Sequence, residues 1–184
     1  MNSRQVTVLA LCSSLLFVGC GKTSPNTLQP QQTPDQSSKT NTPIEACQIL
    51  TREIATAVLG ETVPPAESKT IHSEEFGSTV TSCSYTTEGK DPTKLRTISI
   101  LIRYAKDEAE SKKIFADAKD QSKSIAGANP EDLNGIADEA YWSGGNLNQL
   151  NVRQGKGWFI LSSYFRSGDQ KTLALEMAKK IFTK

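Results

Sequence analysis

The sequence predicts an α+β fold in which a mostly antiparallel sheet carries packed helices. Segments of alternating polarity are joined by short turns, which favours antiparallel pairing. Three segments with helical periodicity stand before, between and after the two groups of strands. The stretch Ile44–Lys184 is long enough to bury one core. The predicted element order is α-β-β-β-α-β-β-β-α.

Residues 1–19 have the pattern of a lipoprotein signal peptide. Arg4 supplies a positive charge, and the apolar run Val6–Val18 is too short to span a bilayer. The stretch Leu16–Cys20, LFVGC, resembles the lipobox of bacterial lipoproteins despite Phe17, which implies cleavage before Cys20 and acylation of that cysteine. The alternative is an ordinary secretory signal. A phosphate-binding loop is excluded because Leu16 stands where its first glycine is needed.

The next segment, residues 20–43, predicts a disordered tether that follows the lipid-anchor cysteine. It is rich in Pro, Gln, Ser and Thr, and Leu28 is its only large apolar side chain. Residues 44–184 then form a single globular domain. The whole chain has 21 Lys+Arg and 20 Asp+Glu, and loss of Arg4 with the signal balances them. This neutrality argues against a nucleic-acid partner.

The first half of the domain begins with a helix over 52–59, between an N-cap at Thr51 and the C′ glycine Gly60. Strands are predicted over 69–73, 79–87 and 97–104, and the last alternates cleanly. A D-x-x-E capping box, Asp107 and Glu110, starts a helix that runs to about Ser122.

The second half repeats the order with different residues. Strands are predicted over 139–142, 147–153 and 156–165, with SGGN and QGKG as the turns between them. A final helix over 170–182 places Leu173, Met177 and Ile181 on one side.

The cysteines predict one disulfide bond. Cys12 leaves with the signal and Cys20 carries lipid, so Cys47 and Cys83 remain. An exported protein with two such cysteines most often pairs them. A zinc site is the alternative, but two thiolates lack the further ligands that zinc requires.

The titratable residues predict no catalytic, metal or cofactor site. His72 is the only histidine, and its neighbours Glu74 and Glu75 are polar surface residues near a turn. The acids Glu131, Asp132, Asp138 and Glu139 lack calcium-loop spacing and are interpreted as solvated surface. For Asp138 we expect a carboxylate that accepts backbone N–H groups of a loop.

Aromatic residues supply the candidate binding surface, which comprises Trp142, Trp158 and Tyr164. Trp158 and Tyr164 share one face of the strand 156–165, while Phe159 and Leu161 share the other. Because both faces are largely apolar, this strand is either covered on both sides or forms an exposed aromatic platform beside SGGN for a glycan or protein partner.

Three motifs resemble those of a family of small bacterial envelope lipoproteins of unknown function. They are CQILTREIATAVLG from Cys47 to Gly60, the C-x-Y of Cys83–Tyr85, and GIADEA from Gly135 to Ala140, in which Ala137 replaces a glycine. The resemblance implies an envelope location and a Cys47–Cys83 bridge, and it supplies no catalytic residue.

These observations favour a lipid-anchored, non-enzymatic binding or assembly module that reaches its envelope protein or glycan partner from the membrane. In a two-membrane source, Gly21 after the lipid cysteine favours the outer membrane; otherwise the cell membrane carries the anchor. The alternatives are a small-ligand or glycan sensor and, less favoured, an envelope hydrolase with paired carboxylates.

Overall fold

A seven-stranded antiparallel sheet organises the residues that the structure describes. The structure is a computed structural model that describes residues 43–73, 78–91, 93–165 and 169–183. Its helices are α1 (Ala46–Ile49), α2 (Arg52–Leu59), α3 (Glu108–Ser122) and α4 (Gln170–Phe182). In spatial order, its strands are β1 (Glu67–Ser73), β2 (Ser78–Thr86), β3 (Thr97–Tyr104), β7 (Gly157–Tyr164), β6 (Gln149–Gln154), β5 (Glu139–Ser143) and β4 (Glu131–Leu133).

The sequence-based fold class is confirmed, and the α2, α3, β3 and α4 segments lie where the capping and alternation patterns predict them. Two short elements were not expected, the single turn α1 and the edge strand β4. Neither has a periodic pattern of its own. Strand β4 is a three-residue segment, EDL, that becomes a strand only by pairing with β5.

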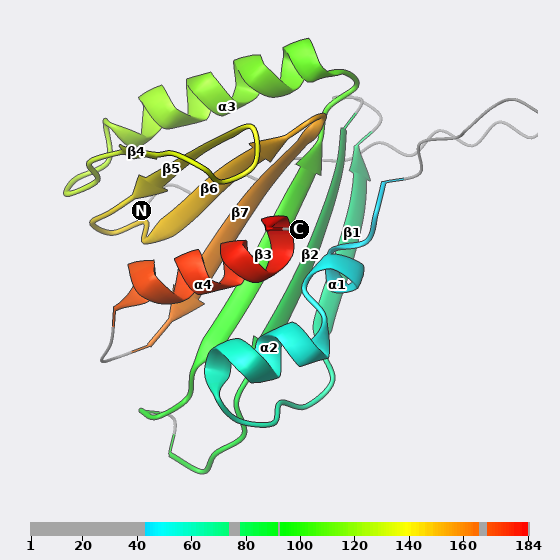
Figure 1. The fold of residues 1–184 in the computed structure, drawn as a ribbon, viewed down its shortest axis with the longest axis vertical. Helices are drawn as coiled ribbons and strands as arrows, with labels where there is room; N and C mark the ends of the chain where they lie inside the picture. The colour runs from blue at the N-terminus through cyan, green and yellow to red at the C-terminus, as the bar shows by residue number, and fades with distance from the viewer. Residues whose placement is uncertain (1–42, 74–77, 92, 166–168, 184) are drawn as a thin grey trace, which may run out of the picture. The chain divides into compact units, whose positions relative to one another are not determined.

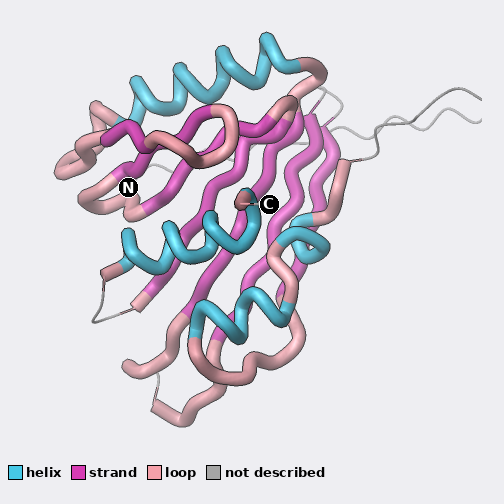
Figure 2. The backbone as a smooth tube through the Cα atoms, viewed as in Figure 1, coloured by secondary structure: helices cyan, strands magenta, loops and turns pink. Residues whose placement is uncertain are grey.

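One face of the sheet is covered by α1, α2 and α4, which lie in front of the strands in Figure 1. Helix α1 contacts β2 and β3, α4 contacts β6 and β7, and α2 packs against α4. Between these helices and the sheet lies the core, whose largest fully buried apolar side chains include Leu50, Leu59, Ile98, Ile100, Ile102, Leu150, Leu161 and Met177. Figure 2 shows the strands running side by side beneath these helices.

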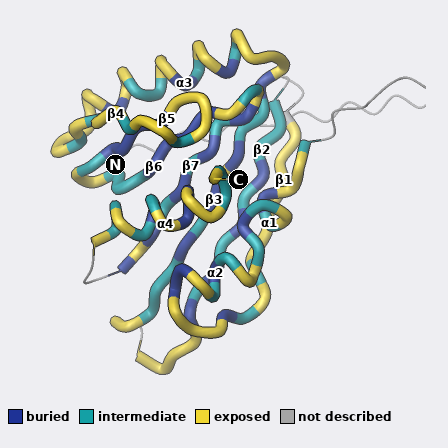
Figure 3. The backbone as a smooth tube through the Cα atoms, in the orientation of Figure 1, coloured by how far each residue is buried: buried dark blue, intermediate teal, exposed yellow. Residues whose placement is uncertain are grey.

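The opposite face of the sheet is covered only in part. Helix α3 contacts β5, β6 and β7, and its Phe115 ring packs edge-on against Tyr141 with centroids 5.0 Å apart. Tyr141 alternates along β5 with the core residues Ala140 and Trp142, so α3 lies on the other side of the sheet. Toward β1 no described helix covers this face, which we call the open face, and Ile71 and Leu101 are exposed there. The face beneath α1, α2 and α4 is called the helix-covered face. Figure 3 shows β1 exposed along its course.

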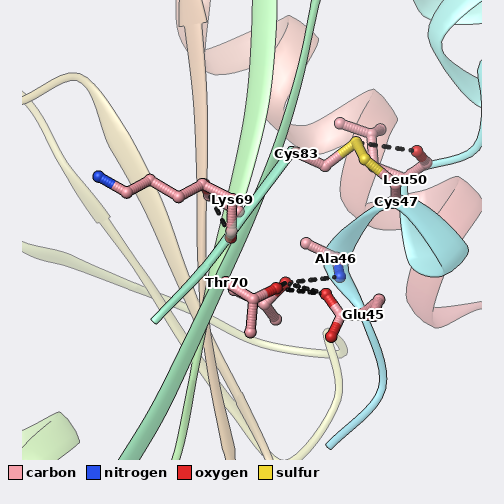
Figure 4. Close-up of a disulfide and its surroundings, with 9 residues drawn as sticks. Glu45, Ala46, Cys47, Leu50, Lys69, Thr70 and Cys83 are labelled. Carbon is pink, nitrogen blue, oxygen red and sulfur yellow. Dashed lines mark hydrogen bonds between the residues drawn. A yellow bond between two sulfur atoms is a disulfide. The ribbon is translucent and has the colours of Figure 1, made fainter. Parts of the chain in front are cut away.

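The disulfide joins α1 to the sheet, as Figure 4 shows. Cys47 of α1 and Cys83 of β2 are bonded, with their Cα atoms 5.1 Å apart. Beside the bridge, the carboxylate of Glu45 accepts hydrogen bonds from the hydroxyls of Thr70 (2.5 Å) and Thr81 (2.9 Å). The predicted pairing is confirmed. Because disulfides persist in oxidising compartments, it indicates an extracytoplasmic location.

The described core, its elements and the disulfide all lie after residue 42, within one compact unit, Thr40–Lys184. A chain that begins at Gly21 therefore retains all of them. Among the helices described, none combines the length and apolar character needed to cross a membrane. Cys20 and nearly all of the proposed tether lie outside the described residues.

Candidate functional site

A hollow of about 330 Å³ adjoins Tyr164, whose side chain lies on the face of the sheet opposite the core, and it extends to Gln170, the first residue of α4. The side chain of Tyr164, the last residue of β7, is among the most exposed large apolar groups described, with 63% of the residue accessible. The residues that line the hollow are neutral: Thr97, Ser99, Asn146, Leu147, Asn148, Gln149, Ser162, Ser163, Tyr164 and Gln170. The site thus combines one aromatic ring and one leucine with hydroxyl and amide groups.

Strand register explains why these polar groups lie together. Ser84 of β2 pairs with Ser99 of β3, Ser99 with Ser162 of β7, and Ser162 with Gln149 of β6. The four side chains therefore form a row across the sheet on the open face. All four are partly exposed, and within the described part of the chain none of them makes a side-chain hydrogen bond to another protein group.

The loop between β5 and β6 forms one wall of the hollow. A Cβ atom on Gly145 would lie 2.0 Å from the carbonyl oxygen of Gly127, so only glycine permits this close approach. Gly145 has a φ of 63°, and Asn148 has a φ of 44°, a region that Asn tolerates better than most residues. The predicted SGGN turn is therefore held against the segment that follows α3, and Asn146, its last residue, and the nearby Asn148 line the hollow beside Tyr164.

The three proposed aromatic residues do not form one surface. Trp158 shares the open-face side of β7 with Tyr164, but it is only partly exposed, and its Nε1 donates to Asn151 Oδ1 at 3.1 Å. Trp142 lies on the helix-covered side of β5 and is 7% exposed, so its assignment to a binding surface is wrong. Since β5 is almost entirely buried on both sides, its alternation could not reveal which way Trp142 points.

A second and larger hollow, the apolar groove, lies on the helix-covered face. It measures about 700 Å³, and its lining residues are Pro43, Ile44, Ile49, Thr79, Tyr104, Ala105, Lys106, Gln154, Lys156, Gly157, Phe159, Ile181 and Phe182. These residues come from the segment before α1, from α1 itself, from one end each of β2, β3, β6 and β7 with the adjoining segments, and from the last turn of α4. No sequence motif predicts the groove, because its walls meet only in the folded chain.

The acidic residues considered for calcium instead form ion pairs. Glu131 pairs with Lys171 at 2.6 Å, and Asp132 pairs with Lys119. Asp138 and Glu139 both bind the guanidinium of Arg153, at 3.1 and 3.0 Å. Within the described ranges, no group of three or more His, Cys, Asp or Glu side chains is arranged to hold a metal ion.

Asp138 also has the structural role that was predicted for it. Its Oδ2 accepts the backbone N–H of Gly155 at 2.8 Å, which ties the loop before β5 to the turn between β6 and β7. Arg153, whose side chain is 5% exposed, fills the space between them. Asp138 and Glu139 thus neutralise a buried cation.

His72 lies on the exposed edge strand β1, and its Nδ1 is 3.1 Å from the hydroxyl oxygen of Thr79. Its sequence neighbours Glu74 and Glu75 are outside the described residues. At the start of α3, Asp107 accepts the N–H of Glu110 at 2.8 Å, as the capping box predicts, while Glu110 accepts the N–H of Lys106 instead of that of Asp107. These acids stabilise the helix terminus.

Comparison of the chain with protein-family models, with curated proteins and with solved structures found no significant match.

Proposed function

We propose that this protein is a lipid-anchored, non-enzymatic envelope module that binds a neutral glycan in the hollow beside Tyr164. The observation that carries the proposal is an exposed aromatic ring bordered by neutral side chains, all of them hydroxyl or amide groups except Leu147. The signal pattern and Cys20 supply the anchor, and the polar segment after it holds the domain away from the membrane. The resemblance to envelope lipoproteins agrees with this placement.

The composition of the hollow favours sugars over other ligands. The C–H face of a sugar ring packs on an aromatic ring, and sugar hydroxyls both donate and accept hydrogen bonds, as Asn, Gln and Ser side chains do. The lining offers no charged group for a phosphate, an ammonium group or a charged peptide. One aromatic ring among several polar side chains offers both the apolar contact and the hydrogen bonds that such a ligand needs.

An envelope hydrolase is less well supported. Paired-carboxylate chemistry needs two acids that can reach the substrate, one of them holding a proton. Asp138 and Glu139 are neighbours, but both are bound to Arg153. Both carboxylates are therefore already engaged by the Arg153 guanidinium.

The test is binding of neutral oligosaccharides to a chain of residues 21–184. Chitotetraose, maltotetraose and mannotetraose are titrated in separate experiments and followed by saturation-transfer NMR and calorimetry. We expect at least one to bind and Tyr164→Ala to weaken its binding at least ten-fold.

The matched control is Ile125→Ala, which removes an exposed apolar side chain outside the hollow. It should bind like the wild type. The glycan proposal is wrong if none of the three sugars binds, or if both variants weaken binding equally.

A further inference from the structure

The apolar groove is a second candidate site, independent of the hollow beside Tyr164. It lies on the helix-covered face of the sheet, whereas Tyr164 points from the other face. Its volume of about 700 Å³ falls within the range of small-ligand sites. The two sites share no lining residue.

Aromatic packing preforms the floor of the groove. The rings of Phe159 and Phe182 meet edge to face, with centroids 5.1 Å apart. A Cβ atom on Gly157 would lie 2.7 Å from the Phe159 ring, so glycine makes room for that ring in the floor. Ile49 and Ile181 add partly buried aliphatic surface from α1 and α4. These groups offer an apolar chain a site that requires little rearrangement.

Two lysines bring positive charge to the groove. The N–H of Ala105 donates to the carbonyl of Lys156 at 3.0 Å, which places the chain at Lys106 beside Lys156. No acidic side chain belongs to the lining, and among the described residues neither lysine forms an ion pair. The carboxylate of Glu110 accepts the backbone N–H of Lys106 at 2.8 Å. Because this carboxylate binds the backbone of Lys106 and not its side chain, both ammonium groups are available to an anionic ligand.

We propose that the groove binds a free, single-chain anionic amphiphile of the fatty-acid class. The apolar chain contacts Phe159, Phe182 and the isoleucines, and the negative head group lies by Lys106 and Lys156. Charge complementarity selects an anion over a cation, and the apolar floor selects a chain over a small polar anion. This site does not depend on the glycan proposal.

The experiment uses the chain of residues 21–184, which carries no attached acyl group. Dodecanoate, dodecanol and dodecylammonium are titrated at concentrations at which each stays monomeric in water, and binding is followed by calorimetry. We expect dodecanoate to bind most tightly. Lys106→Ala/Lys156→Ala should weaken dodecanoate binding at least ten-fold and leave dodecanol binding within two-fold.

Lys90→Ala/Lys94→Ala removes two charges from the loop between β2 and β3, at the opposite end of those strands from Tyr104, and should bind dodecanoate like the wild type. The proposal is overturned if dodecanoate binds no more tightly than dodecanol, or if the two double variants behave alike. It is also overturned if the chain binds phosphatidylglycerol vesicles but not free dodecanoate. Unchanged thermal unfolding of Lys106→Ala/Lys156→Ala separates lost binding from lost folding.

Discussion

At the scale of single residues, Ala137 has an unfavourable backbone conformation. Its φ of 48° lies in the left-handed region, where a non-glycine residue pays about 1 kcal/mol or more. Glycine adopts this conformation without that cost, because it has no Cβ atom.

Ala137→Gly should therefore stabilise the fold, by about 0.5 kcal/mol, after the greater unfolded-state entropy of glycine is subtracted. Urea unfolding of the wild type and the variant measures the difference. The matched control is Ala116→Gly on the exposed side of α3, which should instead destabilise by about 0.5–1 kcal/mol. Destabilisation by Ala137→Gly would show that the alanine methyl makes contacts that outweigh its backbone cost.

At the scale of elements, the sequence predicts best where local interactions decide the structure. Helices α2 and α3 begin at side-chain caps, Thr51 and Asp107, whose hydrogen bonds depend only on nearby residues. Strand β3 alternates because one of its faces is buried beneath helices. Strand β4 could not be predicted this way, because it forms only by pairing with β5. Helix α1 could not be predicted either, because the disulfide to β2 holds it on the sheet.

The same rule holds for the candidate sites: features that depend on local signals could be predicted from the sequence, and features that depend on strand order could not. Tyr164 and the SGGN turn were recognisable because strand alternation and turn chemistry are local signals. Trp142 was assigned wrongly because the polarity pattern of a strand buried on both sides does not reveal its orientation. The row of Ser99, Ser162 and Gln149 depends on strand order, which places β7 beside β3. No local pattern contains that order.

Glu45 makes the attachment of α1 dependent on pH. Hydrogen bonds from the hydroxyls of Thr70 and Thr81 lower the pKa of the Glu45 carboxyl below its ordinary value. Because the pKa is lower in the folded state, the charged carboxylate stabilises the fold above the unfolded-state pKa. That contribution is lost as the pH falls through the folded-state pKa.

Glu45→Gln should therefore lower the melting temperature near neutral pH, and the gap from the wild type should close below about pH 4. Thermal unfolding across this range measures it. The matched control is Glu67→Gln on the exposed strand β1, which makes the same charge change. Among the described residues, the Glu67 side chain forms no hydrogen bond, so this variant should keep the pH profile of the wild type. An equal gap at all pH values for Glu45→Gln would contradict this role.

At the scale of the whole molecule, the disulfide connects the start of the domain to β2, the strand beside the edge strand β1. It closes a loop with a sequence separation of 36, which restricts the unfolded chain. Cys47→Ser/Cys83→Ser should cost about 4 kcal/mol of unfolding free energy, measured in urea. Reduction of the wild type should give the same loss, and the double variant should be insensitive to reductant. Equal stability of oxidised and reduced wild type would contradict this role.

The proposed lipid anchor determines where both candidate sites act, and metabolic labelling tests it directly. Cells that express the full chain are grown with an alkyne analogue of palmitate, and the labelled protein is detected after coupling to a fluorophore. The wild type should carry label and partition into detergent, because acyl chains on Cys20 dominate its membrane affinity. Cys20→Ala should carry no label. Cys12→Ala, which removes a cysteine from the signal segment, should be labelled like the wild type. Persistent label on Cys20→Ala would rule out Cys20 as the acylated residue and leave an ordinary secretory signal as the explanation of residues 1–19.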